Sequence, residues 1–365
     1  MILRVMFSLV IGILLAGFLF LKYHPVFGGK VSQEKGNALS QSENFARGKF
    51  INQIPTVMDT RITTMVGILR DFMKGNPNGK PKRAIPVEPS NSVIMPDNYT
   101  KVTWFGHSTS LLEMDGKLLL LDPMFSQTPS PFSLLGSKRY SRILPIELEE
   151  LPPIDVVILS HDHYDHLDYQ SIKKLKDKVS QFYVPLGVGG HLARWGVKAE
   201  KIKEFDWWDE FKLDALTFVC TPARHFSGRR VSDRDTTLWS SWAIVGQESR
   251  VYFSGDTGYG PHFAKIGEKY GPFDLTLIEC GQYDERWSAI HMMPEETVQA
   301  HFDVNGKILI PIHWSAFTLA LHDWTDPIER VTKAARKRNL CISTPKIGEK
   351  VLIGSVEYPN SIWWR

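Results

Sequence analysis

Residues 160–166 read SHDHYDH, which places three histidines and two aspartates within seven positions. His161 and His163 alternate along the chain, so both side chains can face one point from an extended loop. Asp165 and His166 come one step later, where the chain turns into LDYQSIKKLK, a predicted helix. Zinc favours imidazole nitrogen and carboxylate oxygen as ligands. The stretch therefore predicts two adjacent metal ions, and further ligands are needed from the rest of the chain.

Those further ligands are expected where other strands end. If neighbouring strands end at one edge of a pair of sheets, the residues that follow them converge there. His225, Asp256 and His313 would then complete one site of three histidines and a second of two histidines and an aspartate, with a shared carboxylate between them. The strand-like runs that finish on a histidine or an aspartate are LLLLD (118–122), DVVILSH (155–161), LTFVCTPARH (216–225), RVYFSGD (250–256) and ILIPIH (308–313).

The amino terminus carries a different kind of stretch. Residues 5–21, VMFSLVIGILLAGFLFL, contain no charged residue, and at about 1.5 Å per residue they approach the roughly 30 Å hydrocarbon core of a bilayer. Arg4 and Lys22 flank the run, and no small-x-small cleavage site clearly follows it. A retained membrane anchor is therefore favoured over a cleaved signal peptide. We expect a single span within residues 1–24, with the body outside the cytoplasm.

Residues 25–94 are expected to form a linker that contains one amphipathic helix. Apolar residues between Met58 and Met73 recur at spacings of three and four, which predicts a helix, and GNPNGKP (75–81) is expected to end it. We expect the apolar face of this helix to pack against the main body. A face apposed to the membrane is the alternative.

The rest of the chain has the pattern of a layered enzyme domain. From Lys101 onward, apolar runs and helical stretches alternate with Gly and Pro, which predicts an α/β body over residues 95–365. The net charge of +3 is small, and no arginine-rich stretch interleaves with aromatic residues, which argues against a nucleic-acid partner. The three cysteines lie far apart and form no CxxC pair, so no zinc knuckle is predicted.

The order of the motifs resembles the metallo-β-lactamase superfamily. HxHxDH at His161 is followed by a later histidine, by SGDT (254–257) and by IPIHW (310–314). The resemblance implies a four-layer αββα sandwich with two metal ions at one edge. Membership of this superfamily by itself leaves the reaction open.

Longer stretches are similar to the N-acylphosphatidylethanolamine-hydrolysing phospholipase D family, over roughly residues 95–325. They include TWFGHSTSLLEMDGKLLLLDPMFS (103–126), GSKRY (136–140), ECGQYDERW (279–287) and HMMPEE (291–296). This resemblance implies a zinc-dependent phosphodiesterase that releases phosphatidic acid and an N-acylethanolamine through attack of a metal-activated hydroxide on phosphorus. Iron or manganese could replace zinc at such a site.

The same resemblance implies a role for each candidate site residue. The implied zinc ligands are a first set, His161, His163 and His225, and a second set, Asp165, His166 and His313, with Asp256 bridging the two. Asp165 and Asp256 are also expected to take part in catalysis. His291 is expected to contact phosphate or to donate a proton.

Two other functions stay open from the sequence. Paired ions also activate water against a carbonyl carbon, so a metal-dependent lactonase or another ester hydrolase is the second hypothesis. A membrane-tethered binding protein without catalysis is the third, although all seven ligand positions are filled. Asp162 and His107 are expected to support the site or to pack beside it.

Overall fold

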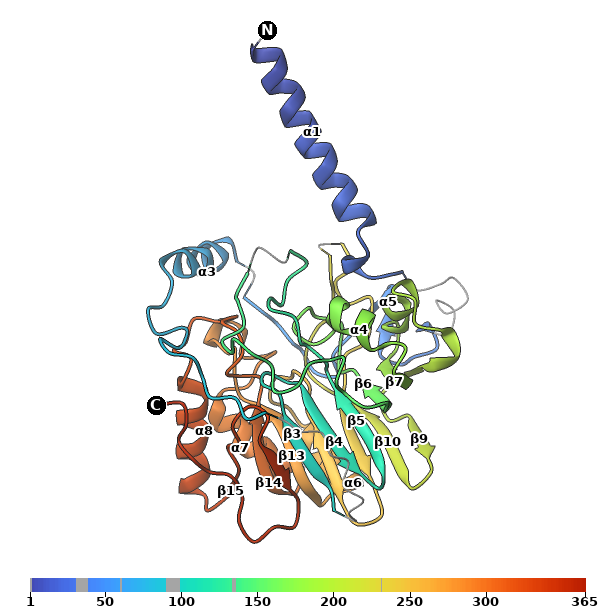
Figure 1. Ribbon diagram of the computed structural model, residues 1–365, viewed down its shortest axis with the longest axis vertical. Helices are drawn as coiled ribbons and strands as arrows, with labels where there is room; N and C mark the ends of the chain where they lie inside the picture. Colours follow the sequence, from blue (N-terminus) through green and yellow to red (C-terminus); the bar gives the residue numbers. More distant parts are fainter. Residues whose placement is uncertain (1, 31–38, 60, 90–98, 133–135, 231) are drawn as a thin grey trace.

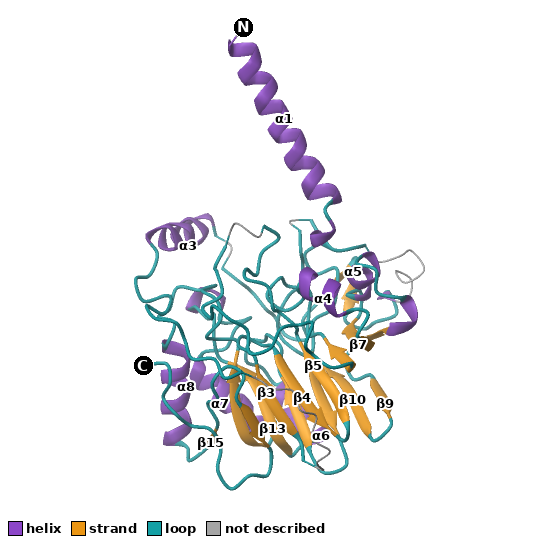
Figure 2. Ribbon diagram, viewed as in Figure 1, coloured by secondary structure: helices purple, strands orange, loops and turns teal. Residues whose placement is uncertain are grey.

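The computed structural model describes residues 2–30, 39–59, 61–89, 99–132, 136–230 and 232–365. Its body consists of two seven-stranded sheets, with helices on their outer sides (Figure 1, Figure 2). The four-layer αββα sandwich that the sequence predicts is therefore confirmed.

The first sheet has the strand order β16, β3, β4, β5, β6, β7, β8. Its apolar side chains alternate between the two faces, as the pleat requires. Leu118 and Leu120 join the buried cluster under the outer helices, whereas Leu119 and Leu121 join the cluster between the sheets. The elements are β3 (Lys101–Trp104), β4 (Ser110–Met114), β5 (Lys117–Leu121), β6 (Ile154–Ile158), β7 (Val179–Pro185), β8 (Ile202–Phe205) and β16 (Lys350–Leu352), with α4 (Tyr169–Leu175), α5 (Gly189–Arg194) and η2 (Ala199–Lys201).

The second sheet has the order β15, β14, β13, β12, β11, β10, β9. Its strands β12, β13 and β14 are parallel and almost continuously apolar, because the other sheet covers one face and helices cover the other. The elements are β9 (Glu210–Leu213), β10 (Leu216–Thr221), β11 (Ser241–Val245), β12 (Arg250–Phe253), β13 (Phe273–Glu279), β14 (Gly306–Ile312) and β15 (Cys341–Ile342), with α6 (His262–Tyr270), η3 (Glu285–Trp287), α7 (Pro294–Asp303) and α8 (Asp326–Lys337).

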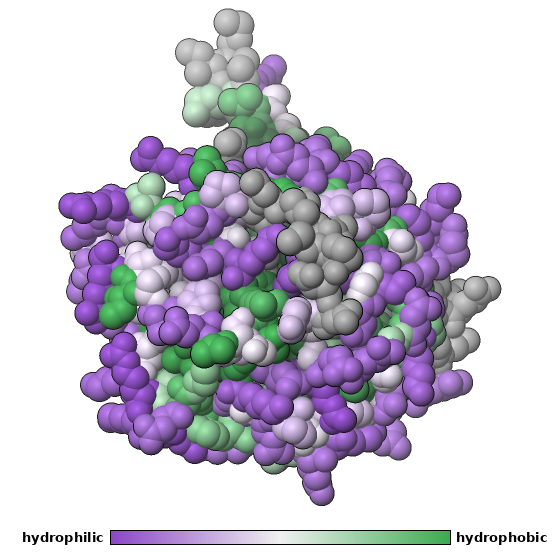
Figure 3. Space-filling view, turned by 60° about the horizontal axis from the view of Figure 1, so that its bottom comes forward, coloured by the Kyte–Doolittle hydropathy of each residue, from purple (hydrophilic) through white to green (hydrophobic). Residues whose placement is uncertain are grey.

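Helix α1 (Ile2–Tyr23) projects from one end of the body (Figure 1). By length and composition its segment Met6–Tyr23 could cross a membrane, a property that signal sequences share, and none of this segment is buried. The short turn η1 (Pro25–Phe27) then joins the helix to the body. Figure 3 brings the opposite end of the body forward, and hydrophilic side chains predominate there around a central hydrophobic group. The apolar helix thus leaves from the other end.

Helix α3 (Ile62–Lys74) lies within the stretch for which the spacing predicts a helix, and it follows a small hairpin of β1 (Phe45–Ala46) and β2 (Lys49–Phe50). The expectation that its apolar face packs against the body is wrong. No residue of α3 is buried, and Met73 is 80% exposed. The periodicity of a sequence identifies an apolar face but does not say what covers it.

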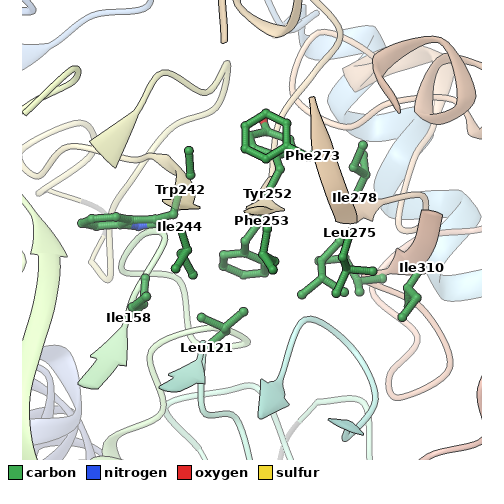
Figure 4. Packing of buried hydrophobic residues seen from close by; sticks show 14 of the residues in the cluster. Leu121, Ile158, Trp242, Ile244, Tyr252, Phe253, Phe273, Leu275, Ile278 and Ile310 are labelled. Carbon is green, nitrogen blue, oxygen red and sulfur yellow. The ribbon is translucent and has the colours of Figure 1, made fainter. Parts of the chain in front are cut away.

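Large apolar side chains fill the space between the two sheets (Figure 4). Leu121 and Ile158 of the first sheet face a group from the second sheet that includes Trp242, Phe253 and Leu275, and all five are fully buried. Truncating such a side chain to alanine typically costs about 2–5 kcal/mol. This packing fixes the two sheets relative to each other, and with them the loops at their edges.

The carboxyl ends of the central strands meet at one edge of the sandwich. Strands β5 and β6 are parallel, as are β12, β13 and β14, and β10 runs in the same direction as β12 because both are antiparallel to β11. The chain therefore brings the residues that follow these strands to one place, as the sequence predicts. These residues are Asp122, the loop 160–166, His225, Asp256 and His313.

Candidate metal centre

The loop after β6 carries four of the predicted ligands. It turns tightly because the backbone N–H groups of His166 and Leu167 both donate to His163 O, at 3.1 and 2.8 Å. The Asp168 side chain then accepts from two N–H groups in the first turn of α4 and caps that helix. The turn and the cap hold the loop at the sheet edge, so that its metal-binding side chains point to one region.

Hydrogen bonds at Nδ1 fix the tautomer of four predicted ligands. A neutral imidazole that donates through Nδ1 leaves Nε2 as a bare acceptor. Nε2 is therefore the atom that each of these four imidazoles presents to a metal ion, in the arrangement that metal-binding histidines commonly have. The Nδ1 contacts are His161 with Ser160 Oγ (2.9 Å), His166 with Asp122 Oδ2 (2.7 Å), His225 with Ile290 O (2.9 Å) and His313 with Gly281 O (3.4 Å).

A first group of nitrogen atoms converges beside the Asp256 carboxylate. His163 Nδ1 lies 2.9 Å from His161 Nε2 and 3.2 Å from His225 Nε2. Asp256 Oδ2 lies 3.8 Å from His161 Nε2 and 3.9 Å from His225 Nε2. A single proton on His163 Nδ1 can form a hydrogen bond with only one of the two Nε2 atoms. A cation, in contrast, stabilises the lone pairs of all three histidine nitrogens together. The donor set therefore fits a metal ion.

A second group forms on the other side of Asp256. His313 Nε2 lies 3.3 Å from Asp165 Oδ2 and 3.2 Å from Asp256 Oδ2, and His166 Nε2 lies 3.0 Å from Asp256 Oδ2. Among the described residues, the buried atom Asp256 Oδ1 has no hydrogen-bond partner. Buried polar atoms are usually paired, so this oxygen also fits a site built for a cation. Asp256 Oδ2 lies within 4 Å of histidine nitrogens of both groups.

The two carboxyl groups are held in their ionised state. Burial raises the pKa of Asp256, but the charges of His166 and His313 outweigh burial and hold that pKa well below its ordinary value. Burial likewise raises the pKa of Asp165, and the charge of His166 with hydrogen bonds from His107 and His313 again lowers it well below its ordinary value. Both side chains are therefore carboxylates at neutral pH, which is the state that binds metal.

The histidines divide into two kinds. Burial lowers the pKa of His161 and His225 well below the ordinary value, so both imidazoles are neutral. Burial also lowers the pKa of His313, but the charge of Asp256 and the hydrogen bond with Asp165 raise it to about 10. A proton on His313 thus offsets the paired carboxylates in the metal-free protein, and binding of a metal ion there would displace it.

His291 lies at the same site, although it is not among the predicted metal ligands. Its ring stacks on His313, with centroids 5.1 Å apart and planes inclined by 11°, and its side chain is 13% exposed. Glu279, fully buried at the end of β13, accepts from Met292 N at 2.8 Å and lies 3.1 Å from His291 Nδ1. Glu279 was not among the site residues predicted from the sequence. The rule of strand-end carboxylates would have found it, because it ends an apolar run.

Three further side chains support the loop. Asp122, noted in the sequence only as a strand-end aspartate, accepts from Ser160 N at 2.7 Å and from His166 Nδ1. His107 Nε2 lies 2.9 Å from Asp165 Oδ2, and burial lowers the pKa of His107 to about 3. Asp162 points away from the cluster, toward His191 and Thr237. The supporting positions expected for His107 and Asp162 agree with these contacts.

A groove of about 470 Å³ lies beside His225, a residue of the first group. Its lining includes Asn52 and Ile54 of the expected linker together with Phe226 and Ile290. Asn52 also pairs with the backbone of His225, since its Nδ2 donates to His225 O at 2.8 Å and its Oδ1 accepts from His225 N at 3.1 Å. No motif in the sequence marks Asn52, because its partner lies 173 residues away.

Comparisons with known proteins agree with this architecture. Residues 118–314, which include all seven predicted metal ligands, match a family model described as a β-lactamase superfamily domain. An uncharacterised protein of Mycobacterium tuberculosis is 44% identical over 332 residues, which cover 89% of this chain and 88% of the relative. The N-acyl-phosphatidylethanolamine-hydrolyzing phospholipase D 1 of Caenorhabditis elegans is 38% identical over 234 residues, 61% of this chain and 65% of that enzyme.

Solved structures show the same fold at low sequence identity. Igni18, a metallo hydrolase from the archaeon Ignicoccus hospitalis, superposes with a TM-score of 0.54 at 22% identity, over 70% of this chain and 99% of that one. The family model covers more than half of the chain, and the αββα layers and the converging histidines fit it. The protein therefore belongs to the β-lactamase superfamily, as a hydrolase with the metallo-β-lactamase fold.

Proposed function

We propose that the protein is a phosphodiesterase of the phospholipase D type, which cleaves a glycerophospholipid such as N-acylphosphatidylethanolamine into phosphatidic acid and the N-acylethanolamine. The observation that carries this proposal is the similarity to the Caenorhabditis elegans enzyme, which is 38% identical over 234 residues, 61% of this chain. That match covers 65% of the relative, so its substrate is a proposal for this chain and not a property taken over with the fold.

Two zinc ions are the proposed cofactors. His161, His163 and His225 would hold the first ion, and Asp256 would be shared. Bound together, two such ions supply an activated water and polarise a phosphodiester oxygen. The second ion would be held by Asp165, His166 and His313. The donor atoms of each group lie within 4.8 Å of one another, which supports this assignment.

The remaining polar groups would orient these ligands and the substrate. Asp122 and Ser160 keep His166 and His161 in the tautomers that present Nε2 to metal. The carboxylate of Glu279 at Nδ1 leaves Nε2 of His291 for the substrate, where it would contact the phosphate or donate a proton to the departing alkoxide. The groove beside His225, with Ile54, Phe226 and Ile290 in its walls, would receive an apolar part of the lipid.

Mass spectrometry of the products tests this proposal. The detergent-solubilised, metal-loaded protein is incubated with N-acylated and with plain phosphatidylethanolamine. The Asp256→Ala variant, a chelator-treated sample and an Asp214→Ala variant, which replaces an exposed aspartate, serve as controls. Phosphatidic acid together with the matching N-acylethanolamine or ethanolamine is expected from the wild type and from Asp214→Ala alone. Intact lipid in every sample would overturn the proposal, and turnover of lactones by the same preparation would favour an ester hydrolase.

A further inference from the structure

We propose that helix α3 lies on the surface of a lipid bilayer with its apolar face among the lipids, as a second membrane contact beside α1. The proposal rests on the membrane span that the sequence predicts for α1 and is independent of the proposed reaction. An apolar stripe runs along the helix and faces away from the body. Its residues and their exposed fractions are Ile62 (82%), Met65 (56%), Val66 (58%), Leu69 (60%), Phe72 (44%) and Met73 (80%).

The orientation of α3 is the reverse of that in a soluble amphipathic helix. The residues with partial burial are Thr64, Gly67, Ile68 and Asp71, which a period of about 3.6 residues places on the side opposite to the stripe. Asp71 Oδ2 accepts from Arg286 Nη1 at 2.9 Å, so a charged group ties this side to the body. The helix thus turns a mainly polar edge inward and its apolar stripe outward, which is the arrangement of an interfacial membrane helix.

The position of α1 indicates that a lipid bilayer contacts the apolar stripe of α3. Both helices lie at the same end of the molecule, with the lower end of α1 close to the level of α3 (Figure 1). Basic side chains on α3 itself suit anionic lipid headgroups, since Arg70 and Lys74 are both exposed. The opposite end of the body is mainly hydrophilic (Figure 3). A bilayer crossed by α1 would therefore meet the apolar stripe of α3.

The end of α1 is also fixed to the body, which limits where the membrane can lie. Arg229 donates through Nε and Nη2 to Val26 O, at 3.1 and 2.9 Å, and Trp195 Nε1 donates to Pro25 O at 2.6 Å. Arg229 Nη1 donates to Leu167 O at 2.8 Å and also to Asp162 O, within the metal loop. The Arg229 guanidinium thus links the segment after α1 to the loop that carries the candidate ligands. The sheet edge with the candidate metal centre would therefore be held at a fixed distance from the lipids.

Depth-dependent fluorescence quenching on the full chain tests the proposal. Cys341 is exposed and is replaced by serine, whereas Cys220 and Cys280 are buried and stay. Single variants Leu69→Cys on the stripe, Thr63→Cys away from it and Leu14→Cys in α1 are labelled with an environment-sensitive fluorophore. The labelled chains are reconstituted into vesicles of phosphatidylcholine with phosphatidylglycerol. Quenching by spin-labelled lipid is expected to be several-fold stronger at Leu69→Cys than at Thr63→Cys, and strong at Leu14→Cys.

Three results would overturn it. Equal, weak quenching at Leu69→Cys and Thr63→Cys, together with strong quenching at Leu14→Cys, would show that α1 spans the bilayer and that α3 does not contact it. A blue shift at Leu69→Cys without quenching by lipid would mean that protein covers the stripe, for example a second copy of the chain. Weak quenching at Leu14→Cys would remove the span itself. None of these readouts depends on turnover, so a protein inactive on phospholipids still gives a clear result.

Discussion

At the scale of single residues, the carboxylate of Asp122 holds two groups on which the candidate centre depends, Ser160 N and His166 Nδ1. Asp122→Ala removes the carboxylate that accepts from both buried donors, at a cost of about 1–3 kcal/mol for such a group. Loss of a partner that orients a ligand typically lowers metal affinity by roughly 10–100-fold, and we expect a loss of that size.

Competition with a chelator measures this affinity. Asp155→Ala is a matched control, because Asp155 also accepts from a backbone N–H, that of Leu118 at 2.9 Å, in the same sheet but away from the site. Equal affinities of the two variants for metal would show that Asp122 has only a structural role.

Glu279 carries a second prediction at this scale. In Glu279→Gln the negative charge beside His291 is lost while the shape of the side chain is kept. We expect kcat to fall by about tenfold or more, since a group that transfers protons or contacts phosphate must be held in place. Metal content is expected to stay at the wild-type value. A wild-type kcat in this variant would exclude Glu279 and His291 from the reaction. A fall in bound metal would mean that the substitution acts on the ligand His313 instead.

At the scale of elements, the sequence predicted best what is local or periodic. The HxHxDH loop, the five strand-like runs and the helix after Met58 are each visible in one short stretch, and the structure has them at those positions. Contacts between distant segments were missed. Asn52 sits in a segment that looks like a plain linker, yet it pairs with the backbone of His225. The packing of α3 was predicted wrongly because amphipathicity does not distinguish a protein core from a lipid surface.

The linker segment gives the prediction at this scale. Asn52→Ala removes both partners of the His225 backbone, so we expect the free energy of unfolding to fall by about 1–3 kcal/mol and the affinity of the first metal group to weaken. Urea denaturation, with and without bound metal, measures both effects. Asn44→Ala is the control, because the Asn44 side chain reaches Asp206 and not the site. Equal stabilities of the two variants would show that the segment does not support the centre.

At the scale of the whole molecule, the candidate centre, α1 and α3 are connected. Arg229 joins the segment after α1 to the metal loop, and the groove beside His225 is walled by the chain that leads to α3. A lipid substrate would then have to move only a short distance out of the membrane to reach the metal ions. This arrangement would confine the enzyme to the surface that holds its substrate.

The most direct measurement of the central claim is anomalous diffraction from crystals of the metal-loaded protein, recorded on both sides of the absorption edge of the bound metal. Two peaks are expected on either side of Asp256, one among His161, His163 and His225 and the other among Asp165, His166 and His313. Crystals of Asp256→Ala are expected to lose density at both positions. A single peak, or peaks away from these side chains, would contradict the binuclear centre and the reaction proposed from it.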